Sequence, residues 1–403
     1  MKSDGLRVLM LSHMYPSPVN PTAGIFVHEQ VRALRSLGHD VRVVSPKGWA
    51  PPLMDRWRAY HAVPGVDVID GVPVLYPRKL TLPGARLGAR NADAMRFAIA
   101  GPLRRVHSRW PFDVIHAQML VPDGWAAAKV GASLGVPVVA TAHRADVIDL
   151  PSRSPALARQ VGDAVASIDQ IVTVSRAIRD SAARWGAPRR PIVVVPNGAD
   201  TSVFQPHDMA EARRRLDLPV DARVVTYVGK LVPRKGVDVL VEAMGRVHSM
   251  RPEGAPLLVV AGIGELRESL EARARELGIG DRMRFVGKIA HDDVAWWMAA
   301  GEFFVLPSHS EGLPTVCCEA LNCGRPVVAT AVDGTPEIVR HEETGLLVPA
   351  GDAAALADAL VRMLDEPGLR DRLAARALEV GQDEFTWLAN ARQTAECYRE
   401  VLR

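Results

Sequence analysis

The segment Ser308–Gly324 has the sequence SHSEGLPTVCCEALNCG and follows a short apolar run, Phe303–Leu306. An apolar run of this length before polar and turn-forming residues predicts a buried strand. Pro314 is well placed at the first position of a helix. The segment is therefore predicted to be a strand-to-helix turn. The unpaired N–H groups and partial positive charge of a helix N-terminus favour phosphate binding at such a turn.

Two glutamates flank this turn. Glu311 is expected on the loop before the helix, and Glu319 more than one turn inside it. At a rise of about 1.5 Å per residue, the helix from Pro314 to Glu319 covers roughly 7–8 Å. The two carboxylates are therefore far enough apart to contact groups on opposite sides of a bound diphosphate. An ordinary strand–helix unit with two surface glutamates is the alternative interpretation.

Strands and helices alternate along the rest of the chain. Each predicted strand is apolar throughout, which indicates parallel sheets covered by helices on both faces. The strands of the first half are predicted at Leu6–Ser12, Asp40–Ser45, Val72–Tyr76, Val114–Ala117, Val136–Ala140, Gln170–Thr173 and Ile192–Val195. Those of the second half are predicted at Arg223–Val228, Leu257–Ala261, Met283–Val286, Phe303–Leu306 and Pro326–Ala329.

The segment Pro196–Asp221 interrupts this alternation and is the predicted link between two halves. A length of 403 residues leaves room for two or three domains. The pattern predicts two doubly wound α/β domains, with the binding site at the carboxyl ends of their strands.

The composition is that of an ordinary globular protein, with 48% apolar and 24% charged residues. No apolar run approaches the roughly 18–20 residues that span a bilayer. The start, MKSDGLRVLMLSHMYP, predicts a first strand and not a signal peptide. The four cysteines show neither metal-ligand nor disulfide spacing, so a reducing cytoplasm is expected.

Charge is distributed unevenly along the chain. Residues 1–200 hold 25 Lys and Arg against 15 Asp and Glu, whereas residues 201–403 hold 24 against 31. The excess is concentrated in the segment Arg78–Arg109, whose only acid is Asp93. Its basic residues are Arg78, Lys79, Arg86, Arg90, Arg96, Arg104, Arg105 and Arg109. Such a face is predicted to attract an anionic membrane or a phosphate-bearing ligand. A merely solvated helix is the alternative.

The loops after the strands of the second half carry further candidates. Gly229 and Lys230 follow one strand, and Lys235 lies five residues further on. Two cations that face a diphosphate would neutralise the charge of a leaving group, although a basic surface loop has the same composition. Gly262 and Gly264 follow the next strand. Because Arg267 occupies the third glycine position of a dinucleotide fingerprint, this motif is weak.

In the first half, Gly24 is expected near the start of a helix, Ser175 at the N-cap of another, and His116 and His143 just after strands. A lone histidine at a strand end is most often a structural residue. His143 is the stronger candidate, since Arg144 and Asp146 share its loop.

Together these motifs resemble the retaining glycosyltransferases of the GT-B fold, specifically family 4. The resemblance rests on the pair Glu311 and Glu319 with seven residues between them, and on the Gly229, Lys230 and Lys235 loop. It also rests on Val195–Asp200, Gly262 with Gly264, and Gly24 with Phe26. It extends over nearly the whole chain, but the acceptor side, roughly residues 46–110, matches no usable motif.

The resemblance implies two Rossmann-like domains that face a central cleft. An acceptor-side domain is expected at residues 1–200 and a nucleotide-sugar-binding domain at 201–380. A C-terminal helix at 381–403 is expected to pack back on the first domain. The implied partners are a nucleoside-diphosphate sugar and a glycan or lipid-linked acceptor, without nucleic acid, divalent metal or other cofactor. The cysteines predict a cytoplasmic location, and the charge of Arg78–Arg109 predicts peripheral contact with the inner face of the cell membrane.

The resemblance also assigns roles to individual residues. Glu319 is expected to bind the ribose and Glu311 the donor sugar, while Lys230 and Lys235 bind the diphosphate. Backbone N–H groups of Leu313–Thr315 and Gly24 assist, and His143 lies beside the transferred sugar. The catalytic candidates are Lys230, Lys235, His143 and Glu311. The donor-binding candidates are Gly24, Gly229, Gly262, Gly264, Gly312, Leu313, Pro314, Thr315 and Glu319. The acceptor-side candidates are His116, Arg144, Asp146 and Ser175.

Two positions depart from the family pattern. Position 230 is often Arg in the family, and Lys230 keeps the charge but loses the bidentate fork. A small residue commonly stands where this chain has Arg144.

The alternative functions on the same fold are those of an epimerase, a phosphorylase and a non-catalytic sugar-nucleotide sensor. The incomplete glycine fingerprint argues against a nucleotide-dependent oxidoreductase.

Overall fold

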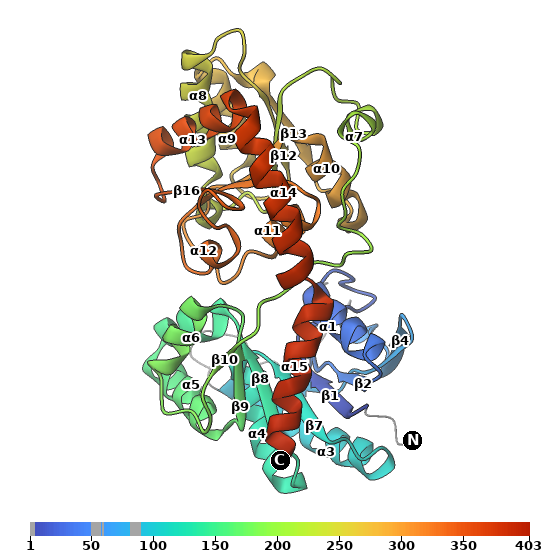
Figure 1. Ribbon diagram of the computed structural model, residues 1–403. Helices are drawn as coiled ribbons and strands as arrows, with labels where there is room; N and C mark the ends of the chain where they lie inside the picture. Colours follow the sequence, from blue (N-terminus) through green and yellow to red (C-terminus); the bar gives the residue numbers. More distant parts are fainter. Residues whose placement is uncertain (1–4, 50–57, 59, 81–89) are drawn as a thin grey trace. The chain divides into compact units, whose positions relative to one another are not determined.

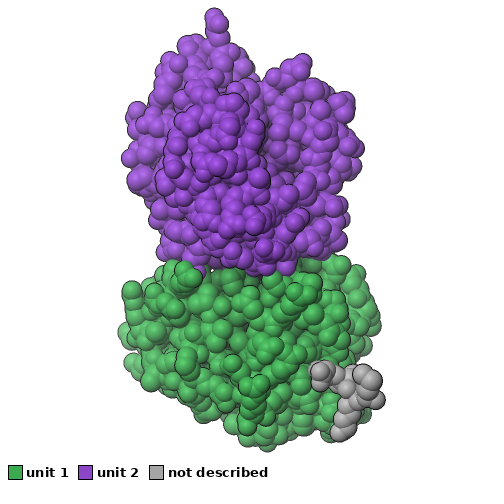
Figure 2. Space-filling view, viewed as in Figure 1, with its two compact units in different colours: residues 1–196, 387–403 green, residues 197–386 purple. Residues whose placement is uncertain are grey.

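The computed structural model describes residues 5–49, 58, 60–80 and 90–403 (Figure 1). The chain forms two compact units (Figure 2). Unit 1 comprises residues 1–196 and 387–403, and unit 2 comprises residues 197–386. The change of unit therefore lies after Pro196, four residues before the expected boundary. The return to unit 1 begins at Trp387 and not at residue 381, because helix α14 (Pro367–Glu384) belongs to unit 2.

Unit 1 is built on an eight-stranded sheet in the order β10-β9-β8-β7-β1-β2-β5-β4. All neighbouring strands are parallel except β4 and β5, which are antiparallel. The strands are β1 (Arg7–Leu11), β2 (Asp40–Val44), β4 (Val66–Ile69), β5 (Val72–Leu75), β7 (Val114–Gln118), β8 (Val138–Ala142), β9 (Gln170–Thr173) and β10 (Val193–Val194). A separate parallel pair joins β3 (Lys47–Trp49) and β6 (Arg78–Leu80).

Helices cover both faces of this sheet. Val8 and Met10 of β1 share a core with α1 (Ile25–Ser36) and α15 (Trp387–Leu402). The second layer contains α3 (Arg90–Arg109), α4 (Trp125–Leu134) and α5 (Pro155–Ser167), and α6 (Arg176–Ala183) follows β9. The C-terminal helix α15 thus belongs to the core of unit 1, which confirms its expected return to the first domain.

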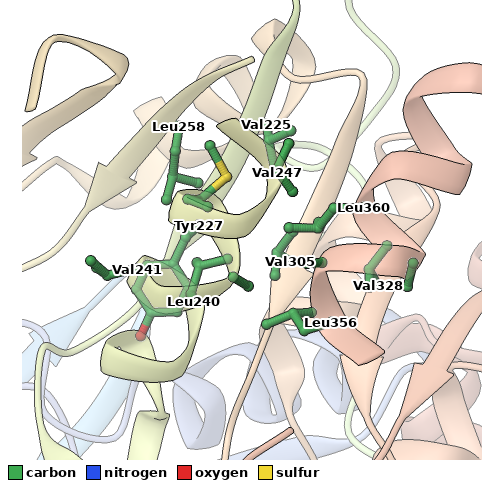
Figure 3. Close-up of a cluster of buried hydrophobic side chains, with 14 of the residues drawn as sticks. Val225, Tyr227, Leu240, Val241, Val247, Leu258, Val305, Val328, Leu356 and Leu360 are labelled. Atoms are coloured by element: carbon green, nitrogen blue, oxygen red, sulfur yellow. The ribbon is translucent and has the colours of Figure 1, made fainter. Parts of the chain in front are cut away.

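Unit 2 has a wholly parallel six-stranded sheet in the order β13-β12-β11-β14-β15-β16. The strands are β11 (Val224–Val228), β12 (Leu257–Ala261), β13 (Met283–Gly287), β14 (Phe303–Leu306), β15 (Val327–Thr330) and β16 (Gly345–Val348). One face packs on α8 (Val237–Met250), α9 (Arg267–Glu276) and α13 (Ala353–Asp365). Figure 3 shows side chains of the central strands meeting those of α8 and α13 in this core. The other face packs on α7 (Met209–Arg215) and α10 (Val294–Ala300).

These two parallel α/β sheets confirm the predicted fold class of two doubly wound Rossmann-like domains. Several short elements were not predicted. They include strands β3 and β4, which lie between the predicted strands Asp40–Ser45 and Val72–Tyr76, and strand β16. Helix α7 lies in the predicted link, where its sequence MAEARRR is too polar for an apolar period to reveal it. No helix in the described parts of the chain is long and apolar enough to cross a membrane.

Candidate active site

The candidate site of unit 2 lies where the order of its strands reverses. Strand β11 has β12 on one side and β14 on the other, so the chain winds outward in both directions from this pair. Thr226 pairs with Phe304, and the loops after β11 and β14 therefore leave the sheet next to each other. In open α/β sheets, ligands bind outside the carboxyl ends of the strands at such a switch point.

The two loops approach each other closely at Gly236. Gly236 begins α8 in a left-handed conformation with φ of 61°. A Cβ at this position would lie 2.1 Å from the carbonyl oxygen of Pro307, in the loop after β14. The N–H of His309 donates to the carbonyl of Arg234 at 2.9 Å. Close approach of the two backbones thus requires glycine at position 236.

Glu311 and Lys235, which the sequence places in different loops, form an ion pair. The Nζ atom of Lys235 lies 2.5 Å from Oε1 of Glu311, and the hydroxyl of Ser308 donates to the same oxygen at 2.6 Å. The side chains of Glu311 and Lys235 are only 6% and 15% exposed. Asp333 accepts from the N–H of Glu311 at 2.8 Å. The carboxylate and the ammonium are therefore both held in one orientation.

Glu319 lies in α11 (Thr315–Asn322) and is half-buried. Burial raises the pKa of its carboxyl group to about 7. Within the described residues, no hydrogen bond or ion pair reaches this carboxylate. A partly buried carboxylate without a partner is costly. However, a carboxylate that accepts hydrogen bonds from a ligand is expected to lack a partner when the ligand is not bound.

The start of α11 supplies fewer backbone donors than expected. Pro314 precedes the first residue of the helix, Thr315, and does not itself begin it. Because proline has no N–H, the expected donors of Leu313–Thr315 reduce to the N–H groups of Leu313 and Thr315. Both groups lie in the same turn as the Glu311 carboxylate.

Lys230 is exposed and follows Gly229 in the loop after β11. The hydroxyl of Tyr227 donates to the carbonyl of Lys230 at 3.0 Å and so fixes the backbone there. Among the described residues no ion pair involves Lys230. Its ammonium group is therefore accessible to an anion at the carboxyl end of β11.

Gly262 and Gly264 allow the loops after β11 and β12 to pack against each other. A Cβ at Gly262, where φ is 146°, would lie 1.8 Å from the carbonyl oxygen of Gly229. A Cβ at Gly264 would lie 2.1 Å from the carbonyl oxygen of Leu231. Arg267 pairs with Glu271 at 2.9 Å. The two glycines thus shape the loop that carries Lys230, and their direct contact with a donor stays a prediction.

In unit 1, His143 follows β8 and is held by its neighbours. Its N–H donates to Asp146 at 2.7 Å, and its Nε2 atom lies 3.2 Å from Oε1 of Gln118. Its ring packs edge-on against Phe26, with 5.1 Å between centroids. Burial lowers its pKa to about 4, so the imidazole is neutral at pH 7. Asp146 is fully buried and also accepts from the N–H of Leu120 at 2.5 Å. It therefore positions His143.

The other acceptor-side candidates have structural partners. His116 lies inside β7 rather than after it, has no exposed surface, and contacts the Tyr398 hydroxyl at 2.6 Å and that of Thr141 at 2.8 Å. It is therefore a core residue that no acceptor can reach. Ser175 is fully buried, and its side chain caps α6 by accepting from the N–H of Ile178. Arg144 pairs with Asp149 at 2.6 Å.

Gly24 precedes α1 with φ of 65°, so the helix begins at Ile25 and Gly24 lies at its start, as predicted. A Cβ at Gly24 would lie 2.2 Å from the carbonyl oxygen of Met14.

The sequence analysis did not identify Ser308 and Asp333, which orient Glu311. It also missed His13 and Asp123, whose side chains meet at 2.7 Å next to the switch point of the unit 1 sheet. Only their positions just after strands could have suggested these residues.

Comparison with known proteins identifies a glycosyltransferase of the GT-B fold. Residues 208–380 match the family model described as glycosyl transferases group 1, and residues 23–203 match that of glycosyltransferase family 4. The chain belongs to this glycosyltransferase family.

Similar proteins include a Bacillus subtilis protein named as a teichuronic acid biosynthesis glycosyltransferase, TuaC. It is 30% identical, and the match covers 99% of both chains. The D-inositol 3-phosphate glycosyltransferase of Acidothermus cellulolyticus is 36% identical over 98% of this chain and 90% of its own.

Solved structures share the whole fold. A sucrose-phosphate synthase from Thermosynechococcus elongatus aligns with a TM-score of 0.77 and 26% identity, over 98% of this chain and 99% of its own. The Anabaena protein HepE, solved in complex with UDP, aligns with a TM-score of 0.76 and 20% identity over 98% and 100%. At that identity the likeness to HepE concerns the fold alone.

Proposed function

We propose that this protein is a retaining glycosyltransferase that moves a sugar from a nucleoside-diphosphate sugar to a hydroxyl group of a glycan, lipid-linked or small-molecule acceptor. The observation that carries the proposal is the set of groups at the switch point of unit 2. There an ordered Glu311–Lys235 pair and exposed Lys230 follow two adjacent strands, and the unpartnered Glu319 lies on the helix after β14. The family membership of the chain supports the same reaction class.

In the proposed reaction, the bond between the anomeric carbon and the diphosphate oxygen breaks while the acceptor oxygen bonds to that carbon from the same face. Lys230, Lys235 and the N–H groups of Leu313 and Thr315 offset the charge that develops on the diphosphate. The acceptor proton passes to the departing phosphate oxygen, so no side chain needs to act as a general base. The lysines supply the neutralising charge, and the proposal includes no divalent metal.

The two glutamates have separate roles in this proposal. Glu311 accepts hydrogen bonds from hydroxyls of the donor sugar, and Glu319 accepts them from the ribose hydroxyls. Donor hydroxyls would supply the partners that the half-buried Glu319 carboxylate lacks. The His143 contact with the transferred sugar rests on the family resemblance alone.

The names of similar proteins support the choice of substrates. HepE has been solved with UDP-glucose, which supports a nucleoside-diphosphate sugar as donor. TuaC is named for teichuronic acid biosynthesis, and other relatives are named D-inositol 3-phosphate glycosyltransferases. A role in polysaccharide or glycolipid biosynthesis is therefore proposed.

We further propose that unit 1 makes peripheral contact with anionic membranes through α3. Arg90, Arg104, Arg105 and Arg109 are exposed on this helix. Phe97, on the same helix, is 71% exposed. A basic helix with an exposed aromatic side chain suits the surface of an anionic bilayer. Arg86, which belongs to the same basic segment of the sequence, lies outside the described residues.

The decisive experiment incubates the purified chain with a panel of uridine, guanosine and adenosine diphosphate sugars, with and without acceptors, in the presence of EDTA. Release of nucleoside diphosphate together with a product of unchanged anomeric configuration by NMR is the expected result. An inverted product, or a requirement for added metal, contradicts the mechanism. An isomerised sugar nucleotide indicates an epimerase, and binding without turnover indicates a sensor.

A further inference from the structure

We infer that an apolar cavity on one face of the unit 1 sheet binds a long-chain fatty acid, with the alkyl chain inside the cavity and the carboxylate at Arg42. The cavity has a volume of about 490 Å³. Its lining residues lie within β1, β2, β4, β5 and α3, and not in loops at the carboxyl ends of strands. The cavity is therefore separate from the candidate active site, and the inference goes beyond the proposed transfer reaction.

Strand pairing brings the side chains that line this cavity to one face of the sheet. Leu9 of β1 pairs with Arg42 of β2, and Val44 of β2 pairs with Leu75 of β5. Leu75 in turn pairs with Val66 of β4, the edge strand of the sheet (Figure 1). Paired residues of neighbouring strands point to the same face. The residues that alternate with them belong to the core on the α1 side of the sheet.

The cavity is almost entirely apolar. Among the described residues that line it, only Arg42 and Asp67 carry a charge. Val66 and Val68 are 68% and 65% exposed, and Val106 of α3 is half-buried. Contiguous apolar surface that stays exposed marks an interaction site. Sites for small molecules are typically apolar hollows of about 300–1,000 Å³ with a few polar groups, which is the character of this cavity.

Arg42 places a cation without a counter-ion at the cavity. Its guanidinium carbon lies 4.3 Å from the centre of the Trp110 ring. Its Nε atom is buried, and within the described parts of the chain no hydrogen bond or ion pair uses the guanidinium group. Arginine has five N–H donors in a rigid fork that matches a carboxylate. The unused donors therefore favour a ligand with an anionic head group.

The two nearest carboxylates in the sequence and the lining have other roles. Asp40, two residues before Arg42 in β2, accepts from the indole N–H of Trp110 at 2.7 Å and so holds the ring on which Arg42 stacks. Asp67 pairs with Val74, whose side chain belongs to the core on the α1 side, so the Asp67 side chain points to that face. Neither carboxylate forms an ion pair with Arg42 in the described structure.

These features match a single-chain carboxylate better than other occupants. The apolar walls would bury an alkyl chain, and Arg42 would bind the carboxylate through two parallel hydrogen bonds. Arg105 and Arg109, which are exposed on α3 next to Val106, add positive charge on this side. A neutral ligand would leave the donors of Arg42 unused. A phospholipid would bring two acyl chains to a cavity of this volume.

Calorimetric titration of the full chain with octanoate, decanoate and dodecanoate, each below its micellar concentration, tests the inference. One fatty acid should bind per chain. Each added CH₂ should tighten binding by about fourfold, as expected for an alkyl group that leaves water. The neutral ligand 1-decanol has the same chain length as decanoate and separates the contribution of the chain from that of the charge.

Variants then assign the binding to this cavity. Arg42→Met keeps the apolar stem and should weaken decanoate by about 10- to 100-fold, the range of a charged hydrogen bond, while the affinity for 1-decanol stays unchanged. Val68→Glu, at an exposed position of β4, should weaken both ligands, because it places a charge beside the alkyl chain. Arg159→Met on α5 and Val220→Glu in unit 2, both exposed, are the matched controls and should leave both affinities unchanged.

The inference is overturned if the wild type binds none of the three fatty acids at a single site. It is also overturned if Arg42→Met, with an unchanged Tm, leaves decanoate unaffected or weakens both ligands equally. If light scattering shows a dimer that Val68→Glu dissociates, and no fatty acid binds, the face is an interface between two copies. If only the flotation of Arg42→Met with phosphatidylglycerol vesicles is lost, the ligand is a membrane phospholipid. These measurements need no donor turnover, so failure of the proposed function leaves the test intact.

Discussion

The ammonium group of Lys235 lies 2.5 Å from a carboxylate oxygen of Glu311, although the two residues belong to loops that follow different strands. Each group therefore holds the other at the switch point of unit 2. Removal of the lysine would leave Glu311, which is only 6% exposed, with Arg234 as its cation, at the longer distance of 3.5 Å. Both the order of the site and the proposed neutralisation of the diphosphate therefore depend on Lys235.

Lys235→Ala is predicted to lower kcat strongly, because the developing charge on the diphosphate loses a cation. A loss of about 2–4 kcal/mol of transition-state stabilisation corresponds to roughly 30- to 1000-fold in rate. Steady-state kinetics with the donor found in the screen measures this change. Lys288→Ala, an exposed lysine of the same unit, is the control and should retain full activity. Undiminished turnover by Lys235→Ala would sink the proposed mechanism.

Glu319→Gln is predicted to change how stability depends on pH. Burial raises the pKa of Glu319 to about 7 in the folded protein, above its value in the unfolded chain. The folded state therefore binds the extra proton between about pH 4.5 and 7, and the free energy of unfolding falls as the pH rises through this window. Without this group, Glu319→Gln should be more stable than wild type at pH 8 by about 1–3 kcal/mol.

The measurement for Glu319 is urea denaturation at pH 5 and pH 8, where the advantage of the variant should be larger at pH 8. Glu253→Gln, at an exposed position, should show no such difference. The same Glu319→Gln variant should have a raised KM for the donor, because an amide accepts fewer ribose hydrogen bonds than a carboxylate. A pH-independent difference in stability would contradict the assigned pKa.

Gly236→Ala is predicted to disrupt the contact between the loops after β11 and β14. The new Cβ would lie 2.1 Å from the carbonyl of Pro307, in addition to the strain of a positive φ. Gly278→Ala is a matched control, since Gly278 has φ of 71° and nothing within 4 Å of its Cβ position. The control should lose about 1 kcal/mol, and Gly236→Ala clearly more, together with its activity. Equal losses in denaturation experiments would show that the clash is relieved elsewhere.

Tyr398→Phe is predicted to destabilise unit 1 without affecting catalysis. The variant removes the 2.6 Å partner of the fully buried His116 Nδ1 atom. An unpaired buried polar atom costs about 1–3 kcal/mol, which thermal denaturation can detect. If His116 is a core residue, the KM for the acceptor should stay unchanged at a temperature where the variant is folded. A specific rise in that KM would return His116 to the acceptor site.

Reversal of charge on α3 is predicted to abolish binding to anionic lipid. The double variant Arg104→Glu and Arg105→Glu should no longer float with vesicles that contain phosphatidylglycerol, whereas the wild type should. Each basic residue near the surface contributes about 1 kcal/mol, and salt should weaken the binding. Arg190→Glu, at an exposed position outside α3, is the control. Failure of the wild type to bind at low salt would remove the membrane proposal.

Local sequence patterns predicted most of the architecture, because a buried parallel strand is a continuous apolar run and each such run is followed by a helical period. The exceptions show the limit of this signal. Helix α7 has only Ala212 and Arg213 buried, so it leaves no clear apolar period. Strand β16, with the sequence GLLV, was also not predicted. The same patterns placed Lys230, Lys235, Glu311 and Glu319 in or just after loops at the carboxyl ends of strands, because a strand and its following loop are contiguous in the chain.

The tertiary structure alone decided which of these side chains meet. Lys235 and Glu311 are 76 residues apart, and His116 and Tyr398 are 282 apart. The burial and partners of such groups depend on segments that fold together from distant parts of the chain, which no local period can encode.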